Sequence, residues 1–182
     1  MAFIQETDLL KNESVKLHKK WNGQLFGTHY SSYARGVAIW IKPGIPFILE
    51  EKRSDPLGRY ILLRGRLDGQ SVVLGSLHVP NSEPFRFLEV ICYALADWIR
   101  LPWILGGDFN TVINVALDRS HPPLPNTPVV KNAKALSHSL RDWSLTDAWR
   151  HIHPIAKEYS FYFPPHQLHT RIDRIICSNQ LL

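Results

Sequence analysis

Cysteine is scarce in this sequence, in which only Cys92 and Cys177 occur among 182 residues. Two isolated cysteines cannot form the framework of a disulfide-rich protein, and they lack the clustered spacing of a zinc site. We therefore expect reduced, buried thiols, as in cytosolic and nuclear proteins. The chain also lacks an opening basic segment followed by an apolar one, so we expect a cytoplasmic or nuclear protein and not a secreted one.

Long hydrophobic runs are absent as well. Apolar stretches such as residues 37–41 and 72–74 are far too short to cross a bilayer, so no membrane partner is expected. With 45% hydrophobic and 20% charged residues, the composition is typical of a globular domain with a core of its own. The net charge of +5 is compatible with a polyanionic partner such as nucleic acid, although many basic proteins bind none.

The hydrophobic pattern predicts both strands and helices. Apolar and β-branched runs predict strands at residues 3–6, 36–42, 59–67, 71–78, 103–105, 158–163 and 171–177. Asp68-Gly69 supplies the turn of a hairpin. Apolar residues at three- and four-residue spacing predict helices at residues 83–99 and 132–143. The proline-rich residues 111–130 read as an irregular surface loop. Hairpins mixed with helices indicate sheets with helices packed outside.

A strand that ends in Gly106-Gly107-Asp108-Phe109-Asn110 is the most informative stretch. Glycine allows a sharp turn and close approach of a substrate. The aspartate could take a proton or hold a metal, and the asparagine could donate to a phosphate oxygen. The same residue types are also the commonest in a plain strand-to-loop turn, so this motif alone does not decide between the two.

Other polar residues follow or interrupt apolar runs. Glu6 ends the first run, where a hard cation such as Mg²⁺ would find an oxygen ligand. Asp173 lies within an apolar strand, and a buried carboxylate there would need a histidine, a cation or several donors. His78 and Asn81 end another strand. Each residue alone has an ordinary structural interpretation.

Eight short motifs follow one another along the chain: Ile-Gln-Glu-Thr (4–7), Gly-Val-Ala-Ile (36–39), His-Val-Pro-Asn (78–81), Gly-Asp-Phe-Asn (107–110), Leu-Asp-Arg-Ser (117–120), Leu-Thr-Asp-Ala-Trp-Arg (145–150), Glu-Tyr-Ser-Phe (158–161) and Thr-Arg-Ile-Asp-Arg-Ile (170–175). In this order they resemble the endonuclease/exonuclease/phosphatase superfamily. Within it, the chain is most similar to the apurinic-endonuclease-like (exonuclease III-like) domain of LINE retrotransposons. The resemblance implies one α/β domain over residues 1–182, a four-layer α/β/β/α sandwich of two mostly antiparallel sheets with outer helices.

The resemblance also implies roles for individual residues. Glu6 resembles the main ligand of a catalytic Mg²⁺, for which Mn²⁺ can substitute. Asp108 resembles the aspartate that orients or deprotonates the attacking water, and Asn110 its neighbour that holds that aspartate and the phosphate. Asp173 resembles the carboxylate that orients a catalytic histidine. The implied chemistry is metal-assisted hydrolysis of a phosphodiester.

Further residues fall where this family contacts its substrate. Asn81 stands at the contact to the scissile phosphate, and Arg119, Ser160 and Thr170 stand where LINE endonucleases face DNA. His78 replaces a tyrosine, and imidazole can also donate to a phosphate. An ordinary strand-end histidine is an equally good reading of His78.

The chain departs from the family pattern at both ends. It begins without the asparagine-bearing strand and helix that precede Gln-Glu-Thr, and it ends before the Ser-Asp-His strand that carries the catalytic histidine. Loss of an acid–base group typically lowers the rate by 10²–10⁴-fold. We therefore expect a single but incomplete domain, weakly active or inactive on its own and poorly stabilised. His166 and His169 lie in a proline-rich stretch, which favours a solvated loop over a metal site.

Three functions follow. The leading hypothesis is a DNA-nicking endonuclease domain, acting on double-stranded DNA and joined in the intact element to a downstream reverse transcriptase. One alternative is a phosphatase or sphingomyelinase-like hydrolase of the same fold. The other is a non-catalytic relic that keeps contacts to DNA or protein.

Overall fold

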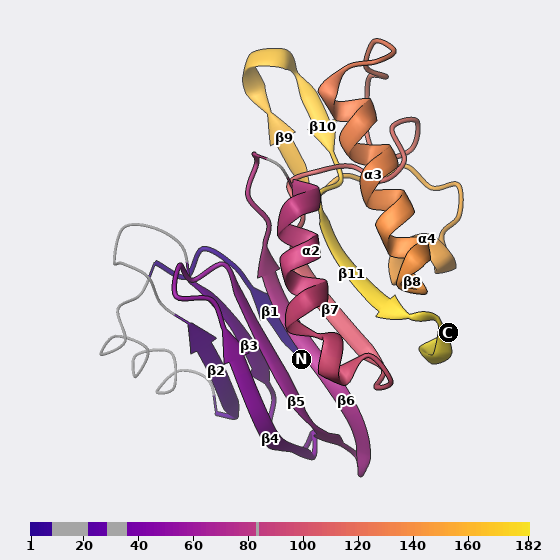
Figure 1. Cartoon of the computed structure of the whole chain (residues 1–182). Helices are drawn as coiled ribbons and strands as arrows, with labels where there is room; N and C mark the ends of the chain where they lie inside the picture. Colours follow the sequence, from indigo (N-terminus) through magenta and orange to yellow (C-terminus); the bar gives the residue numbers. More distant parts are fainter. Residues whose placement is uncertain (9–21, 29–35, 83) are drawn as a thin grey trace. The chain divides into compact units, whose positions relative to one another are not determined.

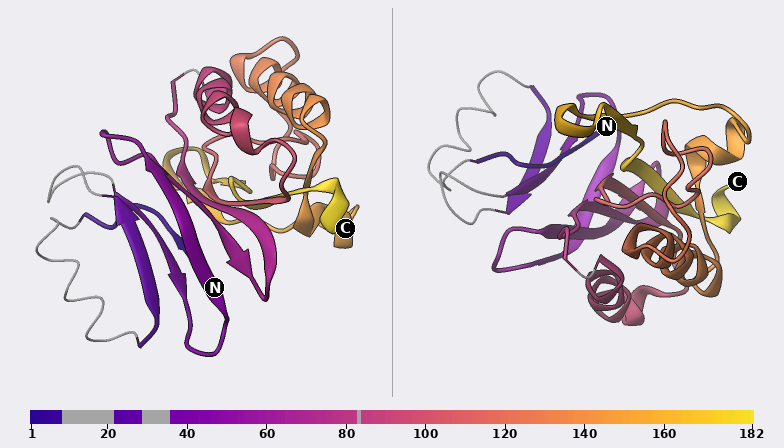
Figure 2. Two further views of the ribbon diagram at one scale, coloured as in Figure 1. Left: turned by 60° about the horizontal axis from the view of Figure 1, so that its bottom comes forward. Right: turned by 90° about the horizontal axis from the view of Figure 1, so that it is seen from above.

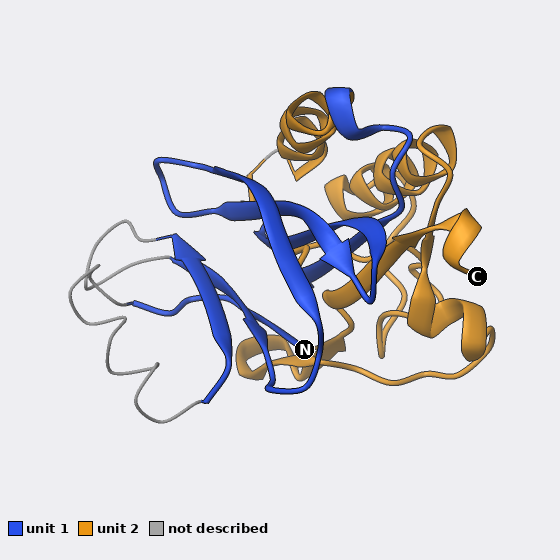
Figure 3. Ribbon diagram, turned by 90° about the horizontal axis from the view of Figure 1, so that it is seen from below, with its two compact units in different colours: residues 1–78, 97–107 blue, residues 79–96, 108–182 orange. Residues whose placement is uncertain are grey.

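The computed structural model describes residues 1–8, 22–28, 36–82 and 84–182, and it has a mixed α/β fold with two main sheets and helices (Figure 1). The chain divides into two compact units (Figure 3). Unit 1 comprises residues 1–78 and 97–107, and unit 2 comprises residues 79–96 and 108–182. The predicted fold class, two main sheets combined with helices, is confirmed.

Unit 1 is built from strands of two sheets. One sheet has the order β1-β3-β2 and consists of β1 (Ala2–Ile4), β2 (Gln24–Thr28) and β3 (Val37–Ile41). In the other sheet four strands follow in the order β4 (Phe47–Ser54), β5 (Tyr60–Leu67), β6 (Gln70–His78) and β7 (Trp103–Asp108). β3 pairs antiparallel with β1 and with β2, and β5 pairs antiparallel with β4 and with β6.

The core of unit 1 lies between these sheets, whose strands are seen from two sides in Figure 2. Val37, Ile39 and Ile41 alternate along β3 and point into this core, where they meet Leu63 of β5 and Leu74 of β6. All five side chains are fully buried. Ala38, on the opposite face of β3, is buried as well, so the continuous apolar run of the sequence corresponds to a strand that is buried along nearly all of its length.

The hairpin between β5 and β6 turns at the two residues that the sequence indicates. Asp68 and Gly69 both have a positive φ, of 51° and 78°. Two central residues with positive φ define the type I′ turn, whose twist matches that of the flanking strands. The predicted hairpin is confirmed.

Unit 2 contains the helices and two pairs of strands. The helices are α2 (Pro84–Ala94), α3 (Pro128–Asp142) and α4 (Ala148–Ile152), with 3-10 turns at Pro164–His166 and Asn179–Leu181 and a third, Ala96–Trp98, that reaches into unit 1. β8 (Leu145–Asp147) pairs antiparallel with β11 (Asp173–Ser178). β9 (Phe161–Phe163) and β10 (Leu168–Thr170) form a hairpin of their own. α2 and α3 lie against one another (Figure 1).

The helix boundaries differ from the predicted ones for identifiable reasons. α3 begins at Pro128, four residues earlier than expected, because proline fits the first turn of a helix, where its missing N–H is not needed. The helix predicted at 83–99 becomes α2, which ends at Ala94, followed by a 3-10 turn at Ala96–Trp98. Glu83, its expected first residue, lies outside the described residues.

Residues 111–130 are not wholly the surface loop that their prolines suggest. Thr111, Val112 and Asp118 are buried, and Asp118 has no exposed surface. The prediction was wrong for this part of the segment, because the backbone there packs inward around charged partners from later in the chain. The proline-rich remainder has no regular structure up to the start of α3.

Both cysteines are free thiols. Cys177 is buried, and burial raises the pKa of the half-buried Cys92 to about 12, which keeps this thiol protonated and inert. Across the described ranges, no helix has the length and apolar character needed to span a membrane.

Candidate functional site

Glu6 stands two residues after the end of β1 in a rare backbone conformation. Its φ is +50°, in the left-handed region that residues other than glycine and asparagine seldom adopt. The residues on either side are held in place: the Gln5 side-chain amide donates to Ser76 Oγ at 3.0 Å, and the Thr7 N–H donates to Gly36 O at 3.1 Å. The Glu6 side chain itself is 70% exposed. A strained, fixed backbone thus carries a solvent-accessible carboxylate.

A buried hydroxyl anchors the segment before Glu6 to the sheet. Ser76 of β6 has no exposed surface, and its Oγ donates to Ile4 O at 3.1 Å while accepting from the Gln5 amide. The strain at Glu6 is therefore balanced by hydrogen bonds to a buried strand.

His78, the last residue of β6, lies beside Glu6. Its Nε2 is 3.9 Å from Glu6 Oε1, and its backbone N–H donates to Arg59 O at 2.8 Å. The imidazole is 19% exposed. Within unit 1 the structure therefore brings together Glu6 and His78, two residues that the sequence marked separately.

The two glycines of the Gly-Gly-Asp motif are required by packing within unit 1. A Cβ on Gly106 would lie 2.4 Å from the ring of Phe3, and a Cβ on Gly107 would lie 2.0 Å from the carbonyl oxygen of Leu77. Real Cβ atoms do not approach other atoms so closely, and the backbone at Leu77 cannot move without breaking its strand. From the sequence, these glycines were expected to allow a sharp turn and close approach of a substrate. In the structure, glycine is required at both positions because any side chain would clash with Phe3 or Leu77.

In unit 2, Asp108 and Asn110 form one hydrogen-bonded turn. Asp108 Oδ1 accepts the backbone N–H of Asn110 at 2.7 Å. Asn110 Nδ2 donates to Val79 O at 2.8 Å, and the Val79 N–H donates to Asp108 O at 2.8 Å. Asn110 has a φ of +48°, which asparagine tolerates better than other non-glycine residues. Side chain and backbone together fix the direction of both polar groups.

The same turn is tied to the segment that carries Asp173. The Phe109 N–H donates to Ile172 O at 2.9 Å, and Phe109 is buried. Ser160 Oγ accepts the backbone N–H groups of Ile172 and Asp173 at 3.1 and 3.0 Å. Unit 2 therefore joins three of the residues singled out in the sequence, Asp108, Asn110 and Asp173, through short backbone links.

Asp173 is exposed, so the expectation of a buried carboxylate in an apolar strand was wrong. β11 alternates its side chains between two faces, and Asp173 and Ile175 fall on the exposed face while Arg174 and Ile176 fall on the buried one. The buried charge that needs partners is that of Arg174.

The residues expected to face DNA differ in exposure. Asn81 and Ser160 are exposed, and Arg119 is half-buried, with its Nε donating to His121 O at 3.2 Å. Burial lowers the pKa of Arg119 from its ordinary value. Thr170 is buried at the base of the β9–β10 hairpin, where it forms a β-bridge with Arg119.

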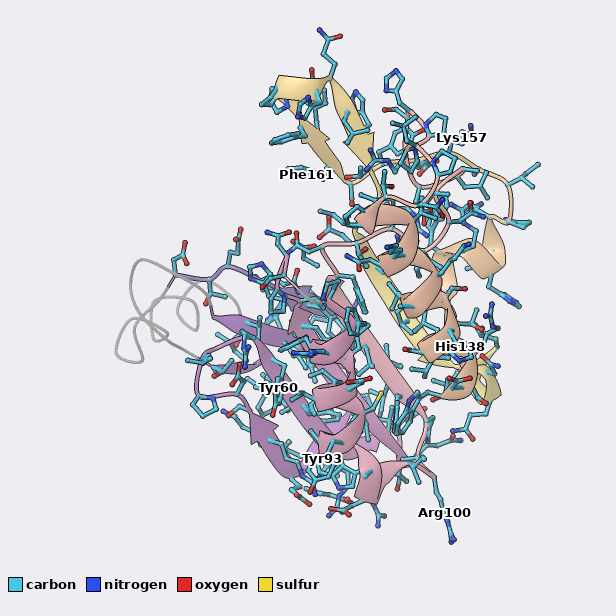
Figure 4. All side chains as sticks on the ribbon, turned by 45° about the horizontal axis from the view of Figure 1, so that its top comes forward. Tyr60, Tyr93, Arg100, His138, Lys157 and Phe161 are labelled. Carbon is cyan, nitrogen blue, oxygen red and sulfur yellow. The ribbon has the colours of Figure 1, made fainter. Side chains whose placement is uncertain are left out.

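The β9–β10 hairpin carries an aromatic surface that the sequence reading did not single out. Phe161, Tyr162 and Phe163 are 47%, 46% and 40% exposed, and Figure 4 labels Phe161 on this hairpin. The Tyr162 and His169 rings lie 4.5 Å apart. Three successive aromatic residues before Pro-Pro were the available signal. In the part of the chain that the structure covers, no three His, Cys, Asp or Glu residues gather as a metal site, at His166 and His169 or elsewhere.

A buried group of charges was also missed, and we name it the Asp–Arg cluster. Its members, all in unit 2, are Asp118, Asp147, Arg150, Arg171 and Arg174. Burial alone would raise the pKa of Asp118, but the surrounding arginines and the backbone N–H of Asn114 outweigh that effect and hold it at about 2. Burial likewise opposes the charge of Asp147, whose pKa is nevertheless lowered by Arg171 and Arg174. All these charges are therefore paired.

Known proteins share both this sequence pattern and this fold. Residues 2–182 match the endonuclease/exonuclease/phosphatase family. Similar structures include an AP endonuclease from Archaeoglobus fulgidus (22% identity, TM-score 0.69, covering 98% of this chain and 76% of that one) and the APE2 catalytic domain of Xenopus laevis (15%, 0.78, 98% and 74%). A 3′–5′ exonuclease from Neisseria meningitidis is also similar (22%, 0.63, 98% and 76%). The structural likenesses concern the fold, and the sequence match shows that this chain belongs to the endonuclease/exonuclease/phosphatase family.

Proposed function

We propose that this chain is a metal-dependent phosphodiesterase that nicks double-stranded DNA, as the endonuclease domain of a LINE-type retroelement does. The observation that carries the proposal is the turn at Asp108 and Asn110, whose polar side chains are held by backbone bonds to Val79 and, through Phe109, to the segment of Asp173. Similarity to AP endonucleases and an exonuclease supports a nuclease over other hydrolases of this family.

Glu6 is the residue that we assign to the metal. Its carboxylate is accessible, and carboxylate oxygens are the ligands that Mg²⁺ prefers. In phosphoryl-transfer sites Mg²⁺ is held by one or two carboxylates, water and substrate phosphates, and we propose that Glu6 is such a carboxylate. A bound Mg²⁺ or Mn²⁺ would neutralise charge on the phosphate.

The remaining chemistry belongs to the side chains. Asp108 orients or deprotonates the attacking water. Asn110 uses one amide hydrogen on Val79 O, and we assign its second hydrogen to a phosphate oxygen. His78, beside Glu6, and the exposed Asn81 donate to the phosphate in the same way. For Asp173 we propose the role that the family resemblance implies, which is to orient a catalytic histidine.

We assign the contacts with DNA to Arg119, to Ser160 and to the exposed aromatic residues 161–163 of the β9–β10 hairpin, which we call the aromatic hairpin. Thr170 is buried, so its proposed role changes from contacting DNA to supporting the hairpin through its bridge with Arg119. The net charge of +5 favours a polyanionic substrate.

The direct test is an assay on supercoiled plasmid. We expect the purified chain to produce nicked circles with Mg²⁺ and none with EDTA. Intact plasmid together with phosphate release from inositol phosphates would instead establish the phosphatase alternative.

The aromatic hairpin predicts a separate effect on DNA binding. Tyr162→Ala should raise the Kd for a duplex oligonucleotide with one unpaired base about tenfold in EDTA, because stacking of an aromatic ring on an unpaired base contributes on the order of 1–3 kcal/mol. Fluorescence anisotropy measures this binding without cleavage.

Tyr93→Ala is the matched control for this experiment. Tyr93 is an 85% exposed tyrosine on α2, away from the hairpin in the sequence and on a different element of unit 2 (Figure 4). We expect its removal to leave the Kd unchanged. Equal weakening in both variants would mean that the hairpin has no special role in binding. Binding by a chain that never nicks would support the non-catalytic alternative.

A further inference from the structure

The Asp–Arg cluster encloses the guanidinium of Arg174. This side chain has no exposed surface, and it donates from Nη1 to Asp147 Oδ2 at 2.8 Å and from Nη2 to Asp118 Oδ2 at 3.0 Å. Nη2 also lies 2.6 Å from Arg171 O and 3.4 Å from Thr111 O. One rigid fork therefore joins β11, the start of α4 and the loop that follows Asn110.

Asp118 also binds the backbone of the loop that follows Asn110. The oxygen that accepts from Arg174, Oδ2, also accepts the backbone N–H groups of Ile113 and Asn114 at 3.1 and 2.9 Å. Its other oxygen accepts from Arg150 at 2.8 Å and Arg171 at 3.2 Å. A single carboxylate thus fixes the chain a few residues beyond Asn110.

Arg171 holds the chain just before Asp173, as Arg174 does just after it. Its guanidinium donates to both oxygens of Asp147, at 3.3 and 2.5 Å, and its backbone N–H donates to Asp118 O at 2.9 Å. Asp173 consequently lies between two buried arginines that share the same two carboxylates. Its own backbone N–H is held by Ser160 Oγ.

Stability alone does not account for such a cluster. Desolvating five charges is costly, and buried ion pairs are often no more stabilising than apolar residues of the same size. The cluster does impose directions, because the hydrogen bonds between guanidinium and carboxylate groups form at set angles, although among the described residues Arg150 Nε and Arg174 Nε have no acceptor. The segments that receive these directions are the loop after Asn110 and residues 171–174, which include Asp173.

We propose that Arg174 is a positioning residue that holds the Asp108–Asn110 turn in register with Asp173. This inference rests on the proposed function, because it takes those three residues as the catalytic groups. Arg174 is linked to the turn by its hydrogen bonds to Thr111 O and to Asp118 Oδ2. It is linked to Asp173 directly, as the next residue in the chain. The hydrogen bond from the Phe109 N–H to Ile172 O connects the turn to the segment of Asp173.

Amide hydrogen exchange tests whether Arg174 holds the Asp108–Asn110 turn, and the measurement does not require the protein to cleave DNA. In Arg174→Met and in the milder Arg174→Lys, we expect the amides of Phe109, Asn110, Ile113 and Asn114 to exchange about 10- to 100-fold faster than in the unchanged chain. Amides in the middle of β5 should keep their protection. Arg53→Met is the control, because Arg53 pairs with Glu51 and Asp97 in unit 1, and it should not alter exchange at these four amides.

Two outcomes would overturn the proposal. One is unchanged exchange at the four amides in folded Arg174→Lys; the other is equal acceleration in β5, which would mean a general loss of stability. If Arg174→Met does not fold, the lysine variant decides. In nicking assays, Arg174→Lys should lower kcat about tenfold and leave KM for DNA nearly unchanged. If the unchanged chain does not nick DNA at all, the proposed function fails while the exchange experiment still tests whether Arg174 holds the turn.

Discussion

Asp108→Asn should abolish nearly all magnesium-dependent nicking while the protein stays folded. The substitution removes the carboxylate that accepts or orients the proton of the attacking water, and loss of such a group lowers rates by about 10²–10⁴-fold. The fold should survive, because the amide oxygen of asparagine can still accept the Asn110 N–H that Asp108 Oδ1 accepts at 2.7 Å. Initial rates of plasmid nicking at saturating Mg²⁺ measure the effect, with circular dichroism as the check on folding.

Asp142→Asn provides the control for a change of charge alone. Asp142 ends α3, is largely exposed and pairs only on the surface, 3.3 Å from His138. We expect its rate to stay within about twofold of the unchanged chain, since exposed ion pairs contribute little. If Asp108→Asn nicks plasmid as fast as Asp142→Asn, Asp108 has no chemical role and the observed activity comes from elsewhere.

Asp118→Asn should lower the free energy of unfolding by about 3–5 kcal/mol, because it leaves buried arginines without a full countercharge. Asp118 has no exposed surface and contacts Arg150, Arg171 and Arg174. Chemical denaturation at neutral pH measures the loss. Asp97→Asn is the matched control: Asp97 is 78% exposed and pairs with Arg53 at 3.2 Å, and its loss should cost less than about 1 kcal/mol.

The same carboxylate predicts an acid transition. The pKa of Asp118 is about 2 in the folded chain, below the ordinary value of 3.8. Its ionised form therefore contributes stability that is fully present above about pH 4 and is lost as the pH falls toward 2. Asp147, whose pKa is also lowered, acts in the same direction. In Asp118→Asn the unfolding free energy should depend less steeply on pH over this window. An unchanged dependence would mean that Asp118 is not the titrating group.

The sequence predicts those strands and turns that are marked by a local signal, such as an apolar run or a pair of turn residues. Val37–Ile41 is a continuous apolar run, and Asp68-Gly69 favours a tight hairpin, so β3, β5 and β6 were found. β4 was missed because its Glu-Glu-Lys-Arg run reads as a loop. Its charges are met by arginines of β5, among them Arg66, whose Nε donates to Glu50 Oε1 at 3.1 Å. β10 was missed because its Leu-His-Thr sequence is not an apolar run.

The candidate site was predicted to a similar extent. Glu6, Asp108, Asn110 and Asp173 can be named from motifs, but the partners that fix them cannot. Arg174 and its acceptor Asp118 are 56 residues apart in the sequence, and no local pattern joins them. The error on Asp173 has the same origin. A one-residue alternation decides which neighbour is buried, and only the paired strand shows which face is inside.

The division of the chain into units has a consequence for its synthesis on the ribosome. Unit 1 needs residues 97–107 as well as residues 1–78, so it cannot be completed when its first part has emerged. Until β7 arrives, β6 is an open strand edge, and open edges invite pairing with other nascent chains. Residues 79–96 must also wait, since the rest of unit 2 is made last. The nascent chain is thus most exposed to misassembly while α2 is emerging from the ribosome, the interval in which a chaperone would protect it most.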